Sequence, residues 1–196
     1  MAANMKAVKL RMKSIQSTMQ ITKAMELVAS SKLRKAKERA DASRPYFHTL
    51  ENTLKQIAAG NTDLSSVYTK KSKNEKWCYV VIAGDRGLAG GYNSNLFKEM
   101  ESQTAGKDYC VLPIGKKAVE YYKRRGIELV TEEFAEAGDI SVSDCFEIAA
   151  LLCRAFKAGE FGHAALGYTN FVSMLSQKPD VSSMLPLEDL SGEEKD

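Results

Sequence analysis

The stretch that decides the fold covers residues 5–57 and reads MKAVKLRMKSIQSTMQITKAMELVASSKLRKAKERADASRPYFHTLENTLKQI. It has no glycine and one proline, Pro45, and good helix formers dominate it. Alternating steps of three and four residues from Met5 meet sixteen positions, and thirteen of them are apolar. These thirteen, termed the seam, are Met5, Val8, Met12, Ile15, Met19, Ala29, Leu33, Ala36, Ala40, Phe47, Leu50, Leu54 and Ile57. A 3.5-residue repeat over about seven heptads needs a partner helix, so the sequence predicts one long coiled-coil helix, with Pro45 as the expected kink.

A second apolar line lies off the seam and consists of Ile21, Ala24, Met25 and Val28. A helix that is apolar on two faces is normally surrounded, so we expect contacts on several sides of residues 19–29. Next along the chain comes a basic belt formed by Lys32, Arg34, Lys35, Lys37 and Arg39. Charge of one sign favours an acidic surface opposite, with a solvated cationic face as the alternative. Nucleic acid is disfavoured as a partner, because no aromatic residues alternate with these cations.

Composition divides the chain in two and excludes several protein classes. Residues 1–57 hold 12 Lys and Arg against 4 Asp and Glu, whereas the remainder holds 16 against 21.

The longest apolar runs, residues 77–83 and 148–153, are far shorter than the roughly 20 residues of a membrane-spanning helix. The start of the chain has no secretion or transit signal. Cys78, Cys110, Cys145 and Cys153 match no zinc, redox or disulfide spacing, which favours small core hydrophobes of a reducing compartment.

The rest of the chain alternates between β-branched or aromatic runs and amphipathic runs. This pattern predicts strands at residues 77–83, 109–114, 127–134 and 163–172, helices at 95–103, 116–125 and 143–158, and a further edge element at 182–187. Ser143 is the expected N-cap of the last helix and Gly159 its stop. The predicted fold class is α/β, with a small, mainly parallel sheet flanked by helices in a Rossmann-like globule. The expected domains are a helix at 1–59, a polar linker or loop at 60–76, the globule at 77–187 and a disordered acidic tail at 188–196.

Candidate chemistry is sparse and centres on one glycine-rich turn between a predicted strand and a predicted helix. Its members are Gly84, Asp85, Arg86, Gly87, Gly90 and Gly91. A phosphate could sit on the backbone N–H groups of such a turn, but the glycine spacing fits neither the phosphate loop nor the dinucleotide fingerprint. A structural turn is therefore favoured, with a nucleotide site as the alternative. His48 and His163 have no ligands nearby in sequence, so we expect no catalytic residue, metal or cofactor.

Two motifs carry a resemblance to a known family. Residues 21–33, ITKAMELVASSKL, with SRPY at 43–46, and residues 85–95, DRGLAGGYNSN, resemble the gamma subunit of F-type ATP synthases, most nearly the bacterial forms. The likeness extends over nearly all of residues 4–187. The family continues from there into a second long helix, which this chain lacks, so we expect a truncated form whose isolated seam self-associates or leaves the helix frayed. We expect such a truncated form not to be competent for ATP synthesis on its own.

The resemblance implies a role without bond chemistry. The long helix would be half of a rotating shaft inside the alpha/beta hexamer, and the globule would stand against the membrane c-ring and the epsilon subunit. The shaft residues that would meet the acidic levers of the beta subunits are Ile21, Lys23, Met25, Val28, Lys32 and Arg34. The resemblance further implies a peripheral protein on the cytoplasmic face of the bacterial plasma membrane, in a proton-translocating complex. A coiled-coil adaptor and a nucleotide-binding α/β protein are the alternatives.

Overall fold

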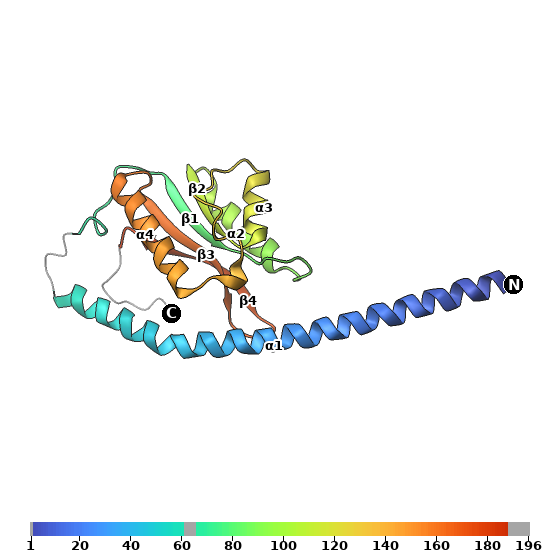
Figure 1. Cartoon of the computed structure of the whole chain (residues 1–196). Helices are drawn as coiled ribbons and strands as arrows, with labels where there is room; N and C mark the ends of the chain where they lie inside the picture. Colours follow the sequence, from blue (N-terminus) through green and yellow to red (C-terminus); the bar gives the residue numbers. More distant parts are fainter. Residues whose placement is uncertain (1, 61–65, 188–196) are drawn as a thin grey trace. The chain divides into compact units, whose positions relative to one another are not determined.

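The first part of the chain is one uninterrupted helix. The computed structural model describes residues 2–60 and 66–187, and the chain forms two compact units, one before and one after residue 60. Helix α1 (Ala2–Gly60) makes up the first unit (Figure 1). It continues through Pro45, and the hydroxyl groups of Thr49 and Thr53 donate to carbonyl oxygens four residues earlier. The predicted long helix is thus confirmed.

The second unit is built on a four-stranded sheet in the order β2-β1-β3-β4 (Figure 1). Strand β1 (Trp77–Ile82) lies in the middle and pairs in parallel with β2 (Tyr109–Ile114) and with β3 (His163–Phe171). Strand β4 (Gln177–Leu185) returns antiparallel to β3 at the edge. The predicted α/β class with a mainly parallel sheet is confirmed.

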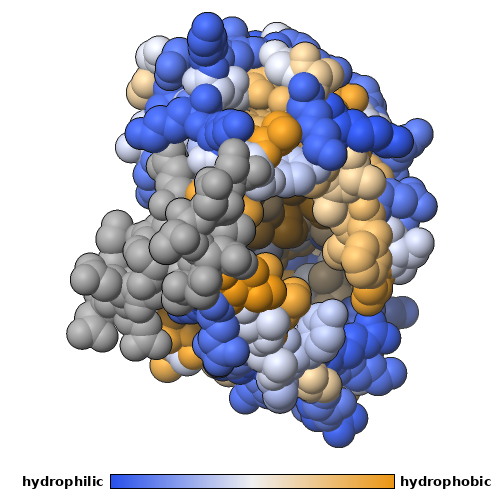
Figure 2. Space-filling view, turned by 90° about the vertical axis from the view of Figure 1, so that its left-hand side faces the viewer, coloured by the Kyte–Doolittle hydropathy of each residue, from blue (hydrophilic) through white to orange (hydrophobic). Residues whose placement is uncertain are grey.

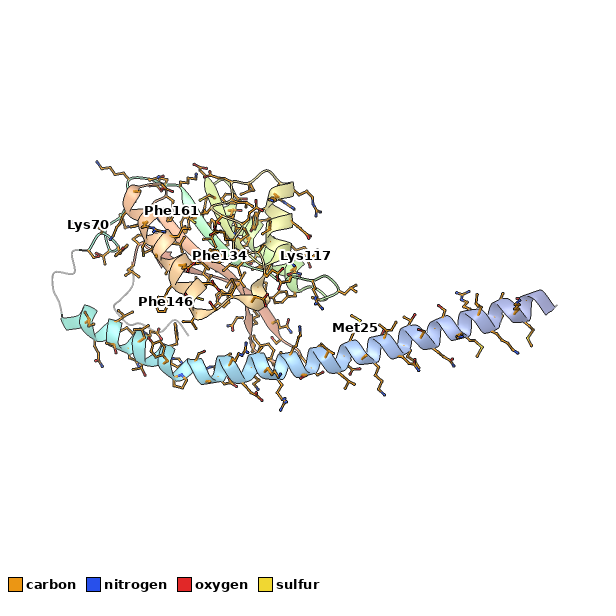
Figure 3. All side chains as sticks on the ribbon, in the orientation of Figure 1. Met25, Lys70, Lys117, Phe134, Phe146 and Phe161 are labelled. Atoms are coloured by element: carbon orange, nitrogen blue, oxygen red, sulfur yellow. The ribbon has the colours of Figure 1, made fainter. Side chains whose placement is uncertain are left out.

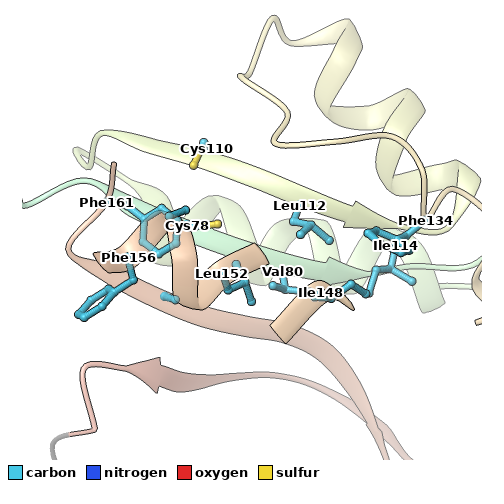
Figure 4. Packing of buried hydrophobic residues seen from close by; sticks show 12 residues of the cluster. Cys78, Val80, Cys110, Leu112, Ile114, Phe134, Ile148, Leu152, Phe156 and Phe161 are labelled. Carbon is cyan, nitrogen blue, oxygen red and sulfur yellow. The ribbon is translucent and has the colours of Figure 1, made fainter. Parts of the chain in front are cut away.

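Helices cover both faces of this sheet. Helix α4 (Val142–Ala158) packs Ile148, Leu152 and Phe156 against β-strand residues such as Val80 and Leu112 (Figure 4). Helices α2 (Tyr92–Thr104) and α3 (Lys116–Arg124) cover the opposite face around Tyr79 and Val111. Because β1 and β2 are buried on both faces, their sequences are almost continuously apolar, whereas the edge strand β4 is largely exposed and more polar.

The strand expected at residues 127–134 is wrong. Only one parallel bridge forms there, between Leu129 and Val111, and Val130 N–H donates to the Val111 carbonyl over 2.9 Å. The chain then turns, since Thr131 Oγ1 accepts the N–H of Glu133, and Phe134 enters the core beside α4. Burial of the Phe134 ring therefore ends the pairing after a single residue.

Several boundaries also differ from the expected ones. Helix α4 is capped by Ser141 and not by Ser143: Ser141 Oγ accepts the Asp144 N–H, and the Asp144 carboxylate accepts the Ser141 N–H in return. Glycine at position 159 adopts the left-handed conformation that ends the helix, as expected. Residues 182–185 of the expected edge element belong to the longer strand β4, which ends before residues 186–187, and α2 begins at Tyr92 rather than at residue 95.

Part of the polar stretch at 60–76, expected to be a linker or loop, packs against the α/β unit. Within its described part, Tyr68 stacks on Phe156 with ring centroids 6.3 Å apart, and its carbonyl accepts the N–H of Leu187. Residues near Tyr68 therefore belong to the packed α/β unit. Cys78 and Cys110 are buried as expected, but Cys145 is exposed on α4, so the core assignment is wrong for that residue. The acidic tail at 188–196 lies outside the described residues.

Candidate interaction surfaces

Helix α1 presents apolar side chains on two faces. Ile21, Met25 and Val28 are each 57–58% exposed, and Figure 3 shows Met25 projecting from the helix. The large seam residues Met5, Val8, Met12, Ile15, Met19, Phe47, Leu50, Leu54 and Ile57 are exposed as well, whereas Leu33 is half-buried. Soluble proteins rarely expose so long an apolar surface. Hydrophobic residues also reach the surface among hydrophilic ones in the view of Figure 2.

The polar groups of α1 mostly bond within the helix. The Thr22 hydroxyl donates to the Thr18 carbonyl over 2.9 Å. Within the described helix, Arg34 is the one member of the basic belt with an ion pair, at 3.8 Å from Glu38. Both side chains of that pair are largely exposed, so it contributes little to stability. Lys23 and the remaining belt residues, Lys32, Lys35, Lys37 and Arg39, are exposed to solvent and available to an acidic surface.

Asp85 organises the glycine-rich turn. Its Oδ1 accepts the N–H of Ala137 at 2.8 Å and that of Lys116 at 3.2 Å, and Oδ2 accepts the N–H of Gly138 at 3.0 Å. Partial burial acts to raise the pKa of Asp85, but the three backbone donors and the Lys116 cation outweigh it and hold the pKa below its ordinary value. One carboxylate thus joins the segments that follow β1 and β2.

Asn93 holds the other end of the same turn. Its Oδ1 accepts the Gly84 N–H at 2.8 Å, and its Nδ2 donates to the Arg86 carbonyl at 3.4 Å. The Gly84 carbonyl accepts the N–H of Lys117 at 3.0 Å. At Gly115, a Cβ would lie 2.2 Å from the Ala83 carbonyl oxygen, so only glycine permits this close approach. The chain's own contacts therefore fix the shape of the turn.

The hydrogen bonds of the glycine-rich turn argue against a nucleotide site there. The backbone N–H groups that converge near the turn already donate to the Asp85 carboxylate. A phosphate placed there would meet a negative charge instead of free donors. The observed bonds favour a structural turn.

The remaining candidate groups also have structural surroundings. The His163 ring stacks on Trp77 with centroids 4.6 Å apart, and His48 lies 3.8 Å from Glu51 on α1. A pocket near α4 is lined by the carboxylates Glu133, Glu136, Asp139, Asp144 and Glu147. Within residues 2–60 and 66–187, no group of three or more His, Cys, Asp or Glu side chains is placed to hold a metal ion.

Sequence reasoning placed Asp85 in the turn but missed what it binds. Its partners Ala137 and Gly138 are more than fifty positions away, and a backbone N–H carries no sequence signal. Asn93 was missed as well, because its partners Gly84 and Arg86 lie nine and seven positions earlier in the chain, beyond the range of a local turn motif. Leu88, which has a φ of 60° and a fully exposed side chain, was also missed.

Comparison with known sequences gives consistent matches. The family model described as ATP synthase matches residues 4–196. The ATP synthase gamma chain of Ruminococcus albus is 45% identical over 96% of this chain and 67% of its own length. The sodium ion specific ATP synthase gamma chain of Acetobacterium woodii is 36% identical, over 95% of this chain and 62% of its own length. The chain therefore spans about two thirds of the length of these relatives.

A solved structure supports the fold. A chain in the cryo-EM structure of the central stalk and c-ring of the Tetrahymena thermophila mitochondrial ATP synthase superposes with a TM-score of 0.61. It shares 22% sequence identity, and the match covers 85% of this chain and 72% of that one. The arrangement of elements is thus one already seen in a solved protein.

Proposed function

Because this chain belongs to the family of ATP synthase gamma chains, we propose that it acts as the rotor subunit of the central stalk, coupling proton-driven rotation to ATP synthesis in an alpha/beta hexamer. The observation that carries this role is helix α1, whose 59 residues expose apolar side chains on two faces. A helix of this kind needs partners on several sides. A shaft enclosed by a ring of subunits meets that need.

Coupling of rotation to nucleotide affinity requires that the shaft make different contacts with the three beta subunits. A shaft that touched three beta subunits identically would bias none of them, since a ligand shifts an equilibrium only by its differential affinity. The two faces of α1 differ: the seam is one, and the line of Ile21, Met25 and Val28 is the other. As the helix turns, each beta subunit would meet these faces in succession. Its affinity for nucleotide would change with each step.

The chemistry of the contact region suits turning. Near residues 19–29 the exposed side chains are mostly apolar, and apolar contacts are non-directional. A buried ion pair would have to break at every step, which costs several kcal/mol. The cation Lys23 lies within this region, and Lys32 and Arg34 follow it. In the proposed complex they face the acidic levers of the beta subunits as exposed, weakly held pairs.

The α/β unit is proposed to form the foot of the rotor. There it would contact the epsilon subunit and the membrane c-ring, at the cytoplasmic face of the bacterial plasma membrane. None of the described helices is long and apolar enough to cross a bilayer, which suits peripheral attachment. The proposed role is non-catalytic, and the proposed coupling ion is the proton.

Substitution of Met25 by Lys tests the proposal. The variant is assembled with the other synthase subunits in membrane vesicles, and ion pumping is measured per ATP hydrolysed. A new cation where acidic levers pass should hold the shaft and lower this ratio about fivefold, equivalent to about 1 kcal/mol of coupling free energy. The control is Asn52→Lys, which adds the same charge at an exposed position of α1 outside residues 19–29. Equal coupling in both variants and the parent would contradict the proposal.

A further inference from the structure

The α/β unit carries a cluster of exposed cations where the chain enters β1 and leaves α4. The members of this cluster, termed the cationic patch, are Lys70, Lys71, Lys73, Arg154 and Lys157 (Figure 3). Among the described residues, none of the five has a carboxylate within ion-pair distance. The neighbouring Lys76, in contrast, lies 2.7 Å from Glu128. The charge of the patch is therefore available to an anionic partner.

Ring contacts and a hydrogen bond hold the two segments of the patch together. Tyr68 stacks on Phe156, with ring centroids 6.3 Å apart, and Lys157 Nζ lies 5.1 Å from the centroid of the Tyr68 ring. Farther along the same segment, Asn74 Nδ2 donates to the Gly159 carbonyl over 2.8 Å. The segment before β1 is thus fixed to the end of α4, and the five cations share one surface.

Two exposed apolar side chains adjoin these cations. Val67 is 54% exposed and Leu187 is 43% exposed, and the Leu187 N–H donates over 2.8 Å to the carbonyl of Tyr68, the residue next to Val67. Residues 66–76 and 154–162 contain two carboxylates, Glu75 and Glu160, so the region keeps a positive net charge. Peripheral membrane proteins use this combination, because cations attract anionic headgroups and apolar side chains enter the layer beneath them.

The two ends of α4 carry opposite charge. The pocket near its start is lined by Glu133, Glu136, Asp139, Asp144 and Glu147, whereas the cationic patch lies at its end. The 17 residues of α4 separate the two ends by about 25 Å, several times the Debye length of about 8 Å at physiological ionic strength. The acidic end therefore does not cancel the attraction at the patch. Such a separation of charge turns the cationic end of the unit toward an anionic surface.

The composition of the patch favours lipid headgroups over other anionic partners. Four of its five cations are lysines, a residue that is depleted in protein interfaces, where arginine is enriched. Lysine binds phosphate as a mobile point charge, which suits a fluid layer of headgroups. The Tyr68 ring already stacks on Phe156, so it does not offer the free aromatic face that nucleic-acid bases need.

We propose that the cationic patch, together with Val67 and Leu187, binds the headgroups of anionic phospholipids. The inference rests on the proposed function, because the foot of the rotor is the part that would stand at a membrane. It adds a direct lipid contact to that role. The segment before β1 and the end of α4 lie at the amino ends of the parallel strands β1 and β3. These strand ends would therefore face the bilayer.

Cross-linking from position 67 tests the contact. Assembly of the parent chain with the other synthase subunits is measured first, in vesicles of phosphatidylcholine with about one quarter phosphatidylglycerol. A photo-activatable residue then replaces Val67, and the cross-linked species is identified. We expect cross-links to lipid, and none to lipid from the same residue at position 142, exposed at the other end of α4. A parent chain that does not assemble contradicts both proposals. A chain that assembles but cross-links at position 67 to protein alone, or to nothing, contradicts the lipid contact only.

A charge-removing variant, read out at position 67, shows whether the cations drive the contact. It replaces three lysines of the patch by glutamine, Lys70→Gln, Lys71→Gln and Lys73→Gln, and should lower the lipid cross-link yield about tenfold or more, because each cation near an anionic surface adds to the attraction. The matched control removes three exposed cations on other elements, Lys98→Gln, Arg124→Gln and Lys178→Gln, and should leave the yield unchanged. All six side chains are exposed, so thermal unfolding should not shift in either variant. An unchanged yield in the patch variant, or an equal parent yield in vesicles of phosphatidylcholine alone, would overturn the proposal.

Discussion

The two units of this chain place their apolar side chains in opposite ways. The α/β unit buries Cys78, Val81 and Leu112 completely between its sheet and its helices, whereas α1 exposes Met25, Leu54 and the other large residues of its two apolar lines. The first pattern belongs to a domain that folds on its own contacts. The second belongs to a surface completed by other molecules. Substitutions should therefore act on folding in one unit and on assembly in the other.

The largest expected difference in unfolding free energy is between replacing a buried leucine and replacing an exposed one. Leu112→Ala removes a side chain with no solvent exposure and should destabilise the α/β unit by about 3 kcal/mol, from lost burial and the cavity that remains. Leu54→Ala in α1 should leave the unfolding of that unit unchanged. Urea unfolding followed by Trp77 fluorescence measures both. Similar losses in the two variants would erase the distinction between the units.

The second-largest effect is expected for Asp85, whose hydrogen bonds join separate segments of the α/β unit. Asp85→Asn should cost about 1 to 3 kcal/mol, because charged hydrogen bonds to three backbone donors are weakened. The pKa of Asp85 is lowered on folding, so its contribution is present above the unfolded pKa of about 3.9 and is lost as pH falls through the lower folded value. The free energy of unfolding, measured from pH 7 to pH 2, should fall less with decreasing pH in the variant than in the parent. An identical pH profile would contradict this role of Asp85.

A smaller difference in stability is expected between the variants of Ser141 and Ser143. Ser141→Ala removes the N-cap of α4 and should cost about 1 kcal/mol, whereas Ser143→Ala lies inside the helix and should change stability little. Thermal unfolding of both variants, followed by circular dichroism, makes the comparison. Equal losses would mean that the capping pair of Ser141 and Asp144 does not hold the helix start.

The smallest effect is expected on α1. Glu38→Ala breaks the exposed pair with Arg34 and should change helix stability by no more than about 0.5 kcal/mol. Helicity at low protein concentration measures it, with Glu26→Ala as the control because Glu26 has no ion pair within the described helix. A loss above 1 kcal/mol would show that α1 depends on its own surface pairs.

Repeating patterns made much of this fold predictable. The 3.5-residue repeat from Met5 to Ile57 gave helix α1, and the apolar runs beginning at Trp77, Tyr109 and His163 gave the three parallel strands. In each case the feature repeats over many residues and depends on burial. The chain as a whole therefore determines the pattern, and no single side chain can reverse it.

Features set by single contacts were not predictable. Residues 127–134 have a strand-like composition, yet Phe134 turns into the core and leaves one bridge. The cap of α4, in contrast, was predictable, because Asp144 lies three residues after Ser141, which is the spacing of a capping box, whereas Phe146 lies three residues after Ser143. The turn at 84–91 was recognised from its glycines, but the backbone partners of Asp85 and the strained Leu88 depend on the folded neighbours.

Hydrogen exchange along α1 tests the central claim most directly. The claim is that residues 19–29 form a shaft surface that partner subunits enclose. Amide exchange in this segment is measured in the isolated chain and in the chain assembled with the alpha/beta hexamer. The account predicts slowing by about a hundredfold or more on assembly, because enclosure stabilises the helix against local opening. Equal exchange rates in the two states would contradict it.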